Sequence, residues 1–226
     1  MTFSMDYYEL YGLPGCGKTT VSRLLVKQLR EEGYKVADFN DVFLKYNHGY
    51  PRKWEFFKLL FQIKEFPLFY YYWRLYKECD CKSKRRLSNL MILTHRIICT
   101  YKSHEYDILF LEEGVIQFIS SLVYLGTIRD DERICKIVDI LNKIIKIQPI
   151  YCCLDVELSL ERIKGRERAG DRFSKSTDAD VMYQALNYKK ANLDNIASSF
   201  LYKMKIDMTE RIDNNVKILE SKLLNK

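Results

Sequence analysis

The stretch GLPGCGKT at residues 12–19 satisfies the pattern G-x-x-x-x-G-K-[ST] at every fixed position. The apolar run Tyr7–Tyr11 before it is typical of a buried strand, and Thr20–Arg30 after it has the spacing of a helix. A strand, a glycine-rich turn and a helix together form a phosphate-binding loop, because the glycines let backbone N–H groups turn inward and the helix N-terminus adds a positive dipole end. The alternative, a glycine-rich turn with a chance lysine, does not explain the strand and the helix beside it. The chain is therefore predicted to bind a nucleoside triphosphate.

The loop predicts contacts to ATP and Mg²⁺. Lys18 is expected to reach the β- and γ-phosphates, and the Thr19 hydroxyl to ligate Mg²⁺. The polar stretch after the last predicted strand is expected to border the adenine. The residues predicted to contact ATP are Gly12, Pro14, Gly15, Cys16, Gly17, Lys18, Thr19, Thr20 and Asp207.

The length and composition fit one sizeable globular domain. The chain has 226 residues, of which 47% are hydrophobic and 30% are charged, so a substantial core is expected. Its formal net charge of +7 suits an enzyme that binds phosphates and also suits weak nucleic-acid binding. The charge therefore does not separate these two classes of protein.

The cysteines favour a reduced compartment. Seven cysteines and three histidines form neither a C-x-x-C pair nor a zinc-binding spacing. The N-terminus has no basic region followed by an apolar stretch, and the longest apolar-aromatic run, Phe66–Trp73, is too short to cross a bilayer as a helix. We therefore expect a cytoplasmic protein without a membrane partner.

Five short apolar segments, each followed by polar or glycine residues, are predicted to be buried strands. Stretches with helix periodicity separate them, which implies right-handed crossovers and a parallel sheet covered on both faces. We expect an α/β fold: a three-layer α/β/α sandwich of the P-loop NTPase type, with roughly five parallel strands in a single domain over residues 1–226. The predicted strands are Tyr7–Tyr11, Lys35–Phe39, Asp107–Leu111, Ile150–Leu154 and Tyr202–Ile206.

The gap between the second and third predicted strands is much longer than a simple crossover needs, so it is predicted to hold a helical insertion at about residues 42–105. Trp54–Lys77 is crowded with aromatic residues, and Arg85–Tyr101 has apolar residues at helix spacing. Ligands of α/β sheets lie beyond the carboxyl ends of the strands, so the insertion is expected to wall a second-substrate site. Helix–helix packing accounts for most of the aromatic side chains and leaves a few to stack on a flat substrate.

Acidic residues follow the third and the second predicted strands. Glu112, and less strongly Glu113, is expected beside the phosphate loop, where a carboxylate can hold Mg²⁺ through water or accept a proton from an attacking hydroxyl. Adjacent side chains of an extended chain point in different directions, so only one of these acids is expected to face the site. Asp38 and Asp41 could hold or deprotonate the phosphoryl acceptor. Two plainer explanations stay open: surface acids after the third strand, and helix N-capping by Asn40 and Asp41 after the second.

The segment at about residues 160–174 carries a dense group of arginines with glycines among them. Arg162 and Arg166 are four apart and share a helix face, and Arg168 follows between two glycines that offer hinges. Such a segment can close over ATP, exclude water and bring guanidinium groups to the charge on the transferring phosphoryl group. The alternative, a charged surface helix, rarely carries this arginine density beside glycines. The segment is therefore predicted to be a lid.

The sequence LDVELSLERIKGRERAGDRF at residues 154–173 resembles the lid region of thymidylate kinases and related nucleoside and nucleotide kinases. In those proteins a strand ending in Leu-Asp is followed by a helix with lid arginines and by a closing Asp-Arg-Phe. The resemblance implies that Arg162, Arg166 and Arg168 are lid residues and that Asp171-Arg172 closes the lid. It extends to the phosphate loop and to the strand order, but not to the middle third of the chain.

Other features differ from thymidylate kinases. The Leu13-Pro14-Gly15 form of the loop is more similar to adenylylsulfate kinases and other small-molecule kinases. Thymidylate kinases carry Asp-Arg after the third strand and deoxynucleoside kinases carry Glu-Arg-Ser, where this chain has Glu112-Glu113-Gly114. The Glu-Pro-Gly that follows the second strand of thymidylate kinases is absent as well. The resemblance therefore implies a kinase without identifying its acceptor.

Together these features predict an ATP- and Mg²⁺-dependent phosphotransferase that moves the γ-phosphoryl group of ATP to a small acceptor, with nucleosides and nucleotides as the expected class. The alternative is a P-loop ATPase or regulatory nucleotide-binding protein that acts with nucleic acid or a protein partner. A nucleic-acid partner is not expected, and a homodimer stays open. The predicted catalytic residues are Lys18, Glu112, Arg162, Arg166 and Arg168, the predicted metal ligands are Thr19 and Glu112, and the predicted acceptor-site residues are Asp38, Asp41, Arg52, Glu113 and Arg172.

Overall fold

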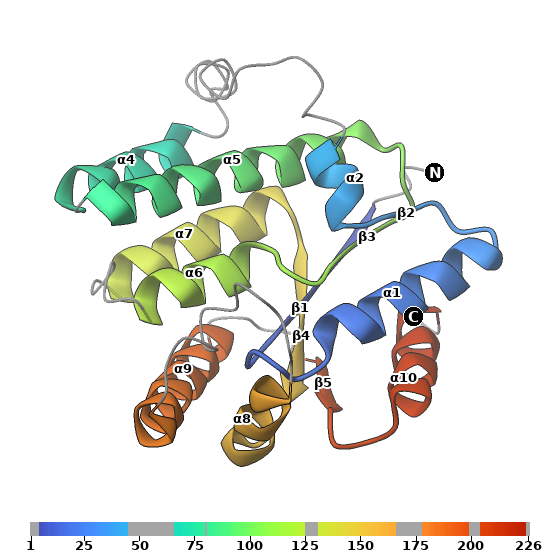
Figure 1. Cartoon of the computed structure of the whole chain (residues 1–226). Coiled ribbons are helices and arrows are strands. Elements are labelled where there is room, and N and C mark those ends of the chain that lie inside the picture. The colour runs from blue at the N-terminus through green and yellow to red at the C-terminus, as the bar shows by residue number, and fades with distance from the viewer. Residues whose placement is uncertain are drawn as a thin grey trace.

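The computed structural model of the chain, drawn in Figure 1, describes residues 5–44, 66–79, 81–124, 131–165, 178–198 and 204–224. Within these ranges five parallel strands form one sheet in the order β2-β3-β1-β4-β5. The strand that leads into the phosphate loop, β1, therefore lies at the centre of the sheet. The strands are β1 (Asp6–Gly12), β2 (Val36–Ala37), β3 (Ile108–Leu111), β4 (Ile147–Cys153) and β5 (Met204–Asp207).

Helices cover both faces of this sheet (Figure 1). In the described ranges they are α1 (Lys18–Glu31), α2 (Phe39–Leu44), α4 (Phe66–Glu78), α5 (Cys81–Ser103), α6 (Val115–Tyr124), α7 (Asp131–Ile144), α8 (Val156–Lys164), α9 (Ala179–Ser198) and α10 (Ile212–Leu224). Tyr8 and Leu10 of β1 pack with α1 and α10 on one face, and Tyr7 and Tyr11 pack with α5, α6 and α9 on the other. This alternation is what a strand buried on both faces requires. The predicted three-layer α/β/α sandwich is confirmed.

The second strand is shorter than the sequence predicted. Of the expected strand Lys35–Phe39, only the residues before Asp38 pair with β3, and Phe39 begins α2. The Asp38 carboxylate accepts hydrogen bonds from Asn40 N at 2.8 Å and from Asp41 N at 3.1 Å. Asp38 therefore caps the N-terminus of α2, and this cap turns the chain out of the sheet.

Helices α2, α4 and α5 lie between β2 and β3 in the chain, as predicted for a helical insertion. α4 and α5 pack together, with Leu68 and Tyr72 buried and the Tyr72 hydroxyl 3.1 Å from Thr94 Oγ1. Tyr70 and Trp73 of α4 stay 42% and 41% exposed. Helix packing thus accounts for one face of α4, and the first part of the aromatic stretch lies outside the described residues. No helix in the described ranges is both long and apolar enough to span a bilayer.

Candidate functional site

The phosphate loop joins the C-terminal end of β1 to the start of α1, at the centre of the sheet (Figure 1). Gly15 and Gly17 have φ angles of 82° and 99°, in the left-handed region where a side chain is strained. The amides of Thr20 and Val21 each donate to Gly17 O at 3.1 Å, so the helix starts directly after that glycine. The predicted succession of strand, glycine turn and helix is confirmed.

Lys18 points back into the loop and is only 9% exposed. Its Nζ donates to Gly12 O at 3.1 Å and to Leu13 O at 2.9 Å, and lies 3.5 Å from Cys16 Sγ. Neutral carbonyls are weaker partners for an ammonium than the charged oxygens of a phosphate. An ATP phosphate that enters the loop can therefore replace these contacts.

Two thiols at the base of the loop interact with the charge of Lys18. A hydrogen bond with Cys152, near the end of β4, and the Lys18 ammonium hold the pKa of Cys16 below its usual value. Burial raises the pKa of the Cys152 thiol. Cys16 therefore carries negative charge more readily than an ordinary cysteine and offsets part of the Lys18 charge.

The outer side of the loop is held by α8 and by the turn after β5. Ser159 Oγ donates to Pro14 O at 2.6 Å. The Arg162 guanidinium donates from Nη2 to Met208 O at 3.0 Å, and its Nη1 lies 3.5 Å from Cys16 O. The structure thus places Arg162, a predicted lid residue, against the loop, where it connects the loop to the end of β5.

A pocket of about 410 Å³ lies beside the loop, next to α8 and the turn after β5. Asn215, 1% exposed, donates from Nδ2 to Asp207 O at 2.9 Å and fixes this turn. The Asp207 carboxylate accepts from Thr209 N and Thr209 Oγ1, and these bonds lower its pKa. Asp207, predicted to border the adenine, thus holds this turn in place, and the residue that follows it, Met208, lines the pocket. The lining residues are Gly15, Cys16, Gly17, Arg162, Gly165, Met208, Glu210, Ile212 and Asn215.

Glu112 follows β3 and lines a second pocket, of about 500 Å³. Its Oε2 atom is buried and has no hydrogen-bond partner within the described part of the chain, whereas Glu113 is exposed. One of the two acids therefore faces a pocket, as expected from alternation along an extended chain. The lining residues are Ser22, Arg23, Val26, Lys27, Arg30, Glu31, Asp38, Phe39, Asn40 and Glu112.

The donor atoms near the loop fit Mg²⁺. A buried carboxylate oxygen without a partner is costly unless a cation or a hydrogen-bond donor meets it, which is the situation of Glu112 Oε2. Mg²⁺ binds oxygen ligands, commonly one or two from the protein and the rest from phosphates and water. Thr19 lies in the first turn of α1, after the central strand, and Glu112 follows the neighbouring strand β3. Among the residues that the structure describes, no three His, Cys, Asp or Glu side chains gather into a metal-binding cluster.

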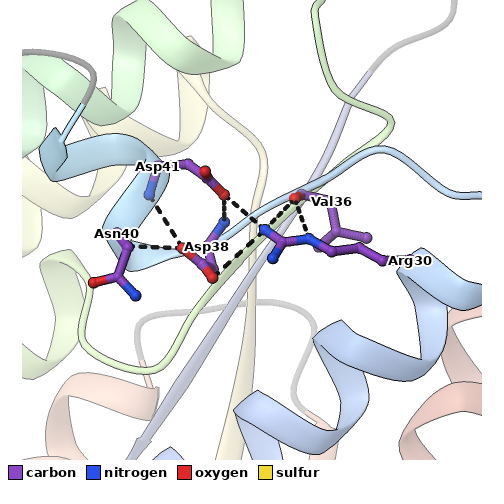
Figure 2. Close-up of polar contacts among 5 residues, drawn as sticks. All are labelled: Arg30, Val36, Asp38, Asn40 and Asp41. Carbon is purple, nitrogen blue, oxygen red and sulfur yellow. Dashed lines mark hydrogen bonds and ion pairs between the residues drawn. The ribbon is translucent and has the colours of Figure 1, made fainter.

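The acids after β2 form one network with the end of α1, as Figure 2 shows. Arg30 donates to Val36 O at 2.8 Å and to Asp41 Oδ2 at 2.7 Å. Asp41 Oδ2 also accepts from Asp38 N at 2.9 Å, and Asp41 N donates back to Asp38, so the two aspartates cap α2 reciprocally. Asp41 is thus engaged in holding the turn. Asp38 lies 3.5 Å from Arg30 through Oδ2 and lines the same pocket as Glu112.

Some predicted site residues cannot be placed in this arrangement. They fall outside the described residues, in the insertion and in the lid segment, and are Arg52, Arg166, Arg168 and Arg172. Three unpredicted polar residues meet the loop or its turn: Ser159, Asn215 and Gln117, whose Oε1 accepts from Gly12 N at 3.2 Å. Each is a buried polar side chain on an otherwise apolar helix face, which is the signal that could have identified it.

Comparison with solved structures finds proteins of the same fold. A structure of deoxyadenosine kinase from M. mycoides with the products dCMP and a flexible dCDP bound gives a TM-score of 0.55 at 15% sequence identity, covering 98% of this chain and 100% of that chain. The structure of that kinase with bound dCTP gives 0.54 at 16% identity, covering 97% and 100%. No protein-family model and no curated protein matches the chain.

At these identities the similarity establishes the fold, and it does so over nearly the whole length of both chains. The kinase resemblance inferred from the phosphate loop and the lid segment therefore extends to the complete architecture. The chain has the α/β fold of P-loop nucleoside kinases.

Proposed function

We propose that this protein is an ATP- and Mg²⁺-dependent phosphotransferase that moves the γ-phosphoryl group of ATP to a nucleoside or nucleotide. The observation that carries the proposal is the buried Lys18 ammonium inside a glycine loop, with one pocket at the loop and another at the end of β3. A phosphotransferase needs such a pair of sites, one for the donor and one for the acceptor. The acceptor class is supported by the fold shared with a deoxyadenosine kinase whose structures contain dCMP with dCDP, or dCTP.

The donor would bind along the loop. The backbone N–H groups of residues 15–20 would surround its phosphates, because they lie at the N-terminus of α1. Lys18 would move from the loop carbonyls to the β- and γ-phosphates. The pocket next to α8 would take the base, between the apolar side chains of Met208 and Ile212 and the buried amide of Asn215.

Thr19 and Glu112 would hold Mg²⁺, directly or through water. The ion held there would supply charge stabilisation for the transferring phosphoryl group. Glu112 has a second proposed role as a general base, because its buried and unpartnered Oε2 can take the proton from the hydroxyl group of a nearby substrate. Metal ligand and general base are the two roles that mutation has to separate.

The acceptor would lie beyond the ends of β2 and β3, against the helical insertion. Asp38 is the proposed contact to its hydroxyl groups, and Asp41 supports Asp38 through the reciprocal cap of α2. Arg52, Glu113 and Arg172 complete the proposed acceptor contacts.

The arginine segment after α8 would close over the bound nucleotide. Arg162 already lies against the loop, and Arg166 and Arg168 would approach the transferring phosphoryl group on closure. A planar guanidinium suits this role because it stays charged and binds phosphate oxygens in pairs.

We also propose a cytoplasmic location, supported by free thiols at Cys16, Cys79, Cys99, Cys152 and Cys153. Small molecules are the proposed partners, without nucleic acid. A homodimer stays a prediction, and sedimentation of the purified protein tests it.

The experiment measures ADP release from ATP and Mg²⁺ with a panel of nucleosides, nucleotides, sugars and single-stranded DNA. Labelled γ-phosphate that appears on a nucleoside or nucleotide supports the proposal. Stimulation by DNA alone would favour the ATPase alternative, and ATP binding without turnover would favour a regulatory nucleotide-binding protein.

Lys18→Ala is the first variant for this assay. Loss of the ammonium should lower phosphoryl transfer by at least about 10³-fold, because the charge contact lies where negative charge develops. Lys217→Ala, which removes an exposed lysine of α10, is the matched control and should transfer phosphate at the wild-type rate.

A further inference from the structure

Glu9 is a carboxylate completely buried in the middle of β1, shortly before the phosphate loop. It lies on the same face of the strand as Tyr7 and Tyr11, towards α6. A buried carboxylate is costly unless several donors meet it. Glu9 has no part in the phosphoryl transfer proposed above, so its presence in this strand calls for another explanation.

The donors that Glu9 meets come from β1 and from the start of α6. Tyr7 Oη donates to Glu9 Oε2 at 2.8 Å, and Gln117 N donates to Glu9 Oε1 at 3.0 Å. The backbone N–H groups of Val115 and Ile116 donate as well. The carboxylate thus occupies the N-terminus of α6, where unpaired N–H groups and the helix dipole favour negative charge.

The turn before α6 leaves room for this carboxylate. A Cβ on Gly114 would overlap Glu9 Oε2 and would lie 2.6 Å from Tyr7 Oη. Gly114 is therefore needed for the close approach of Glu9 to the backbone. The same short turn carries Glu112, so the Glu9 carboxylate lies against the segment that presents the proposed catalytic acid.

The start of α6 also contacts the phosphate loop. Gln117 is 7% exposed, and its Oε1 accepts a hydrogen bond from Gly12 N at 3.2 Å. Its own backbone N–H donates to Glu9. One residue of α6 thus connects the buried carboxylate to the first residue of the loop.

We propose that Glu9 is a positioning residue, which locks the start of α6 onto β1 and thereby fixes Glu112 and Gln117 relative to the phosphate loop. This inference rests on the proposed function for the role of Glu112. Glu9 acts through the turn and through Gln117, because its fully buried side chain reaches neither donor nor acceptor.

Glu9 changes its charge near neutral pH. Burial raises its pKa to about 7, although the hydrogen bonds from Tyr7 and α6 lower it. The charge of Glu9 acts on Tyr7 and Tyr11 of the same strand. The neighbouring elements β3, β4 and α6 carry no Asp, Glu, Lys, Arg or His. Helix α9, which also packs against β1, contributes the buried Lys189 and the exposed Asp194, and the charge of Asp194 acts on Tyr11. The raised pKa means that burial costs the ionised carboxylate more than the hydrogen bonds return, so the start of α6 is held most firmly below this pKa and less firmly as pH rises through it.

The test uses the full-length protein and two variants. Glu9→Gln keeps an oxygen for the α6 amides but cannot ionise, and Glu9→Leu removes the acceptor at similar volume. Amide hydrogen exchange at Gly12 and at residues 112–118, together with ATP affinity, is measured between about pH 5.5 and about pH 8.5, on either side of the pKa of Glu9.

In the wild-type protein we expect the protection factors at the start of α6 to fall as pH rises and to level off above the pKa of Glu9, because opening hydrates the carboxylate and releases its proton. In Glu9→Gln the same amides should stay protected with no such dependence on pH, and in Glu9→Leu they should exchange at least about tenfold faster. Identical, pH-independent exchange in the wild type and in Glu9→Gln would overturn the proposal, and this comparison suffices if Glu9→Leu does not fold.

Hydrogen exchange and ATP binding need no acceptor, so they separate this inference from the proposed function. The expected exchange pattern in a protein that transfers no phosphate would uphold the lock and overturn the kinase assignment. With an acceptor in hand, Glu9→Leu should lower kcat much more than it raises KM for ATP. Faster exchange with an unchanged kcat would overturn the link from Glu9 to Glu112.

Discussion

The two sides of the phosphate loop are built differently. On the side of β4 and β5, side chains bind backbone carbonyls: Ser159 binds Pro14 O, and Arg162 binds Met208 O. On the side of β2 and β3, Glu112 keeps a buried oxygen without a partner in the described part of the chain. Contacts to backbone fix the shape of a site, whereas an unpartnered carboxylate keeps its capacity for a ligand. Under the proposed function, the side of β4 and β5 would form the donor-binding scaffold, and Glu112 on the other side would supply the reactive charge.

The largest effect is expected on the side of reactive charge. Glu112→Gln should lower kcat by about 10²–10⁴-fold, because the amide neither accepts a proton nor ligates Mg²⁺ as a carboxylate does. Steady-state kinetics with the acceptor found in the panel measure this change. Glu113→Gln is the comparison variant: Glu113 is exposed and is proposed only as an acceptor contact, so this change should raise KM for the acceptor and leave kcat close to the wild-type value. Similar losses in the two variants would remove the distinction between these neighbouring acids.

The next largest effect is expected in the proposed lid segment, at about residues 160–174. Arg166→Ala should lower kcat by about 10²–10³-fold, because its contact strengthens as charge spreads over the transferring phosphoryl group. The affinity for ATP, measured by calorimetry, should change far less. Arg211→Ala, at an exposed arginine after β5, serves as the control. Equal losses of affinity and turnover would instead assign Arg166 to ground-state binding.

The phosphate loop could be predicted from sequence because its residues are close in the chain, whereas the contact of Ser159 with Pro14 joins residues 145 apart and could not. Residues 12–19 lie between a strand and a helix that the pattern itself predicts, and the structure confirms both. The cap of α2 is equally local, since Asp38 and Asp41 stand three apart, but strand propensity extends the predicted strand two residues too far, through Asp38 and Phe39.

The contacts of Glu9 could not be predicted in the same way. Gln117 is 108 residues away from Glu9 in the chain, and 105 away from Gly12. These residues meet only because β3 pairs with β1, so that the turn into α6 comes to lie over the central strand. An acid in the middle of the apolar run of β1 was visible in the sequence, but its partners depend on strand order, which local patterns do not give.

The pH dependence of the free energy of unfolding tests the raised pKa of Glu9, which lies in the central strand β1 between the two sides of the loop. The pKa of Glu9 is raised from 4.5 to about 7 in the folded protein. Between pH 4.5 and about pH 7 the folded protein holds a proton on Glu9 that the unfolded chain releases. The contribution of this proton to the free energy of unfolding is therefore complete below pH 4.5 and is lost as pH rises through the folded-state pKa. The free energy of unfolding of the wild type, measured with urea, should therefore fall by up to about 3 kcal/mol relative to that of Glu9→Gln between about pH 4.5 and about pH 8. A difference between the two proteins that stays constant with pH would contradict the raised pKa.

The smallest effects are expected from two side chains, one on each side of the phosphate loop. Ser159→Ala removes a buried hydrogen bond to Pro14 O and should cost about 1 kcal/mol of unfolding free energy, and it should also weaken ATP binding because the loop loses a support. Arg30→Met removes the ion pair with Asp41, whose partners are 43% and 35% exposed, together with the hydrogen bonds to Val36 O, so it should cost about 1–2 kcal/mol of unfolding free energy and leave ATP binding unchanged. Urea unfolding and calorimetric titration with ATP measure both quantities. If Arg30→Met weakened ATP binding as much as Ser159→Ala, the C-terminal end of α1 would also support ATP binding. The contrast between the two sides of the loop would then not hold for α1 and β2.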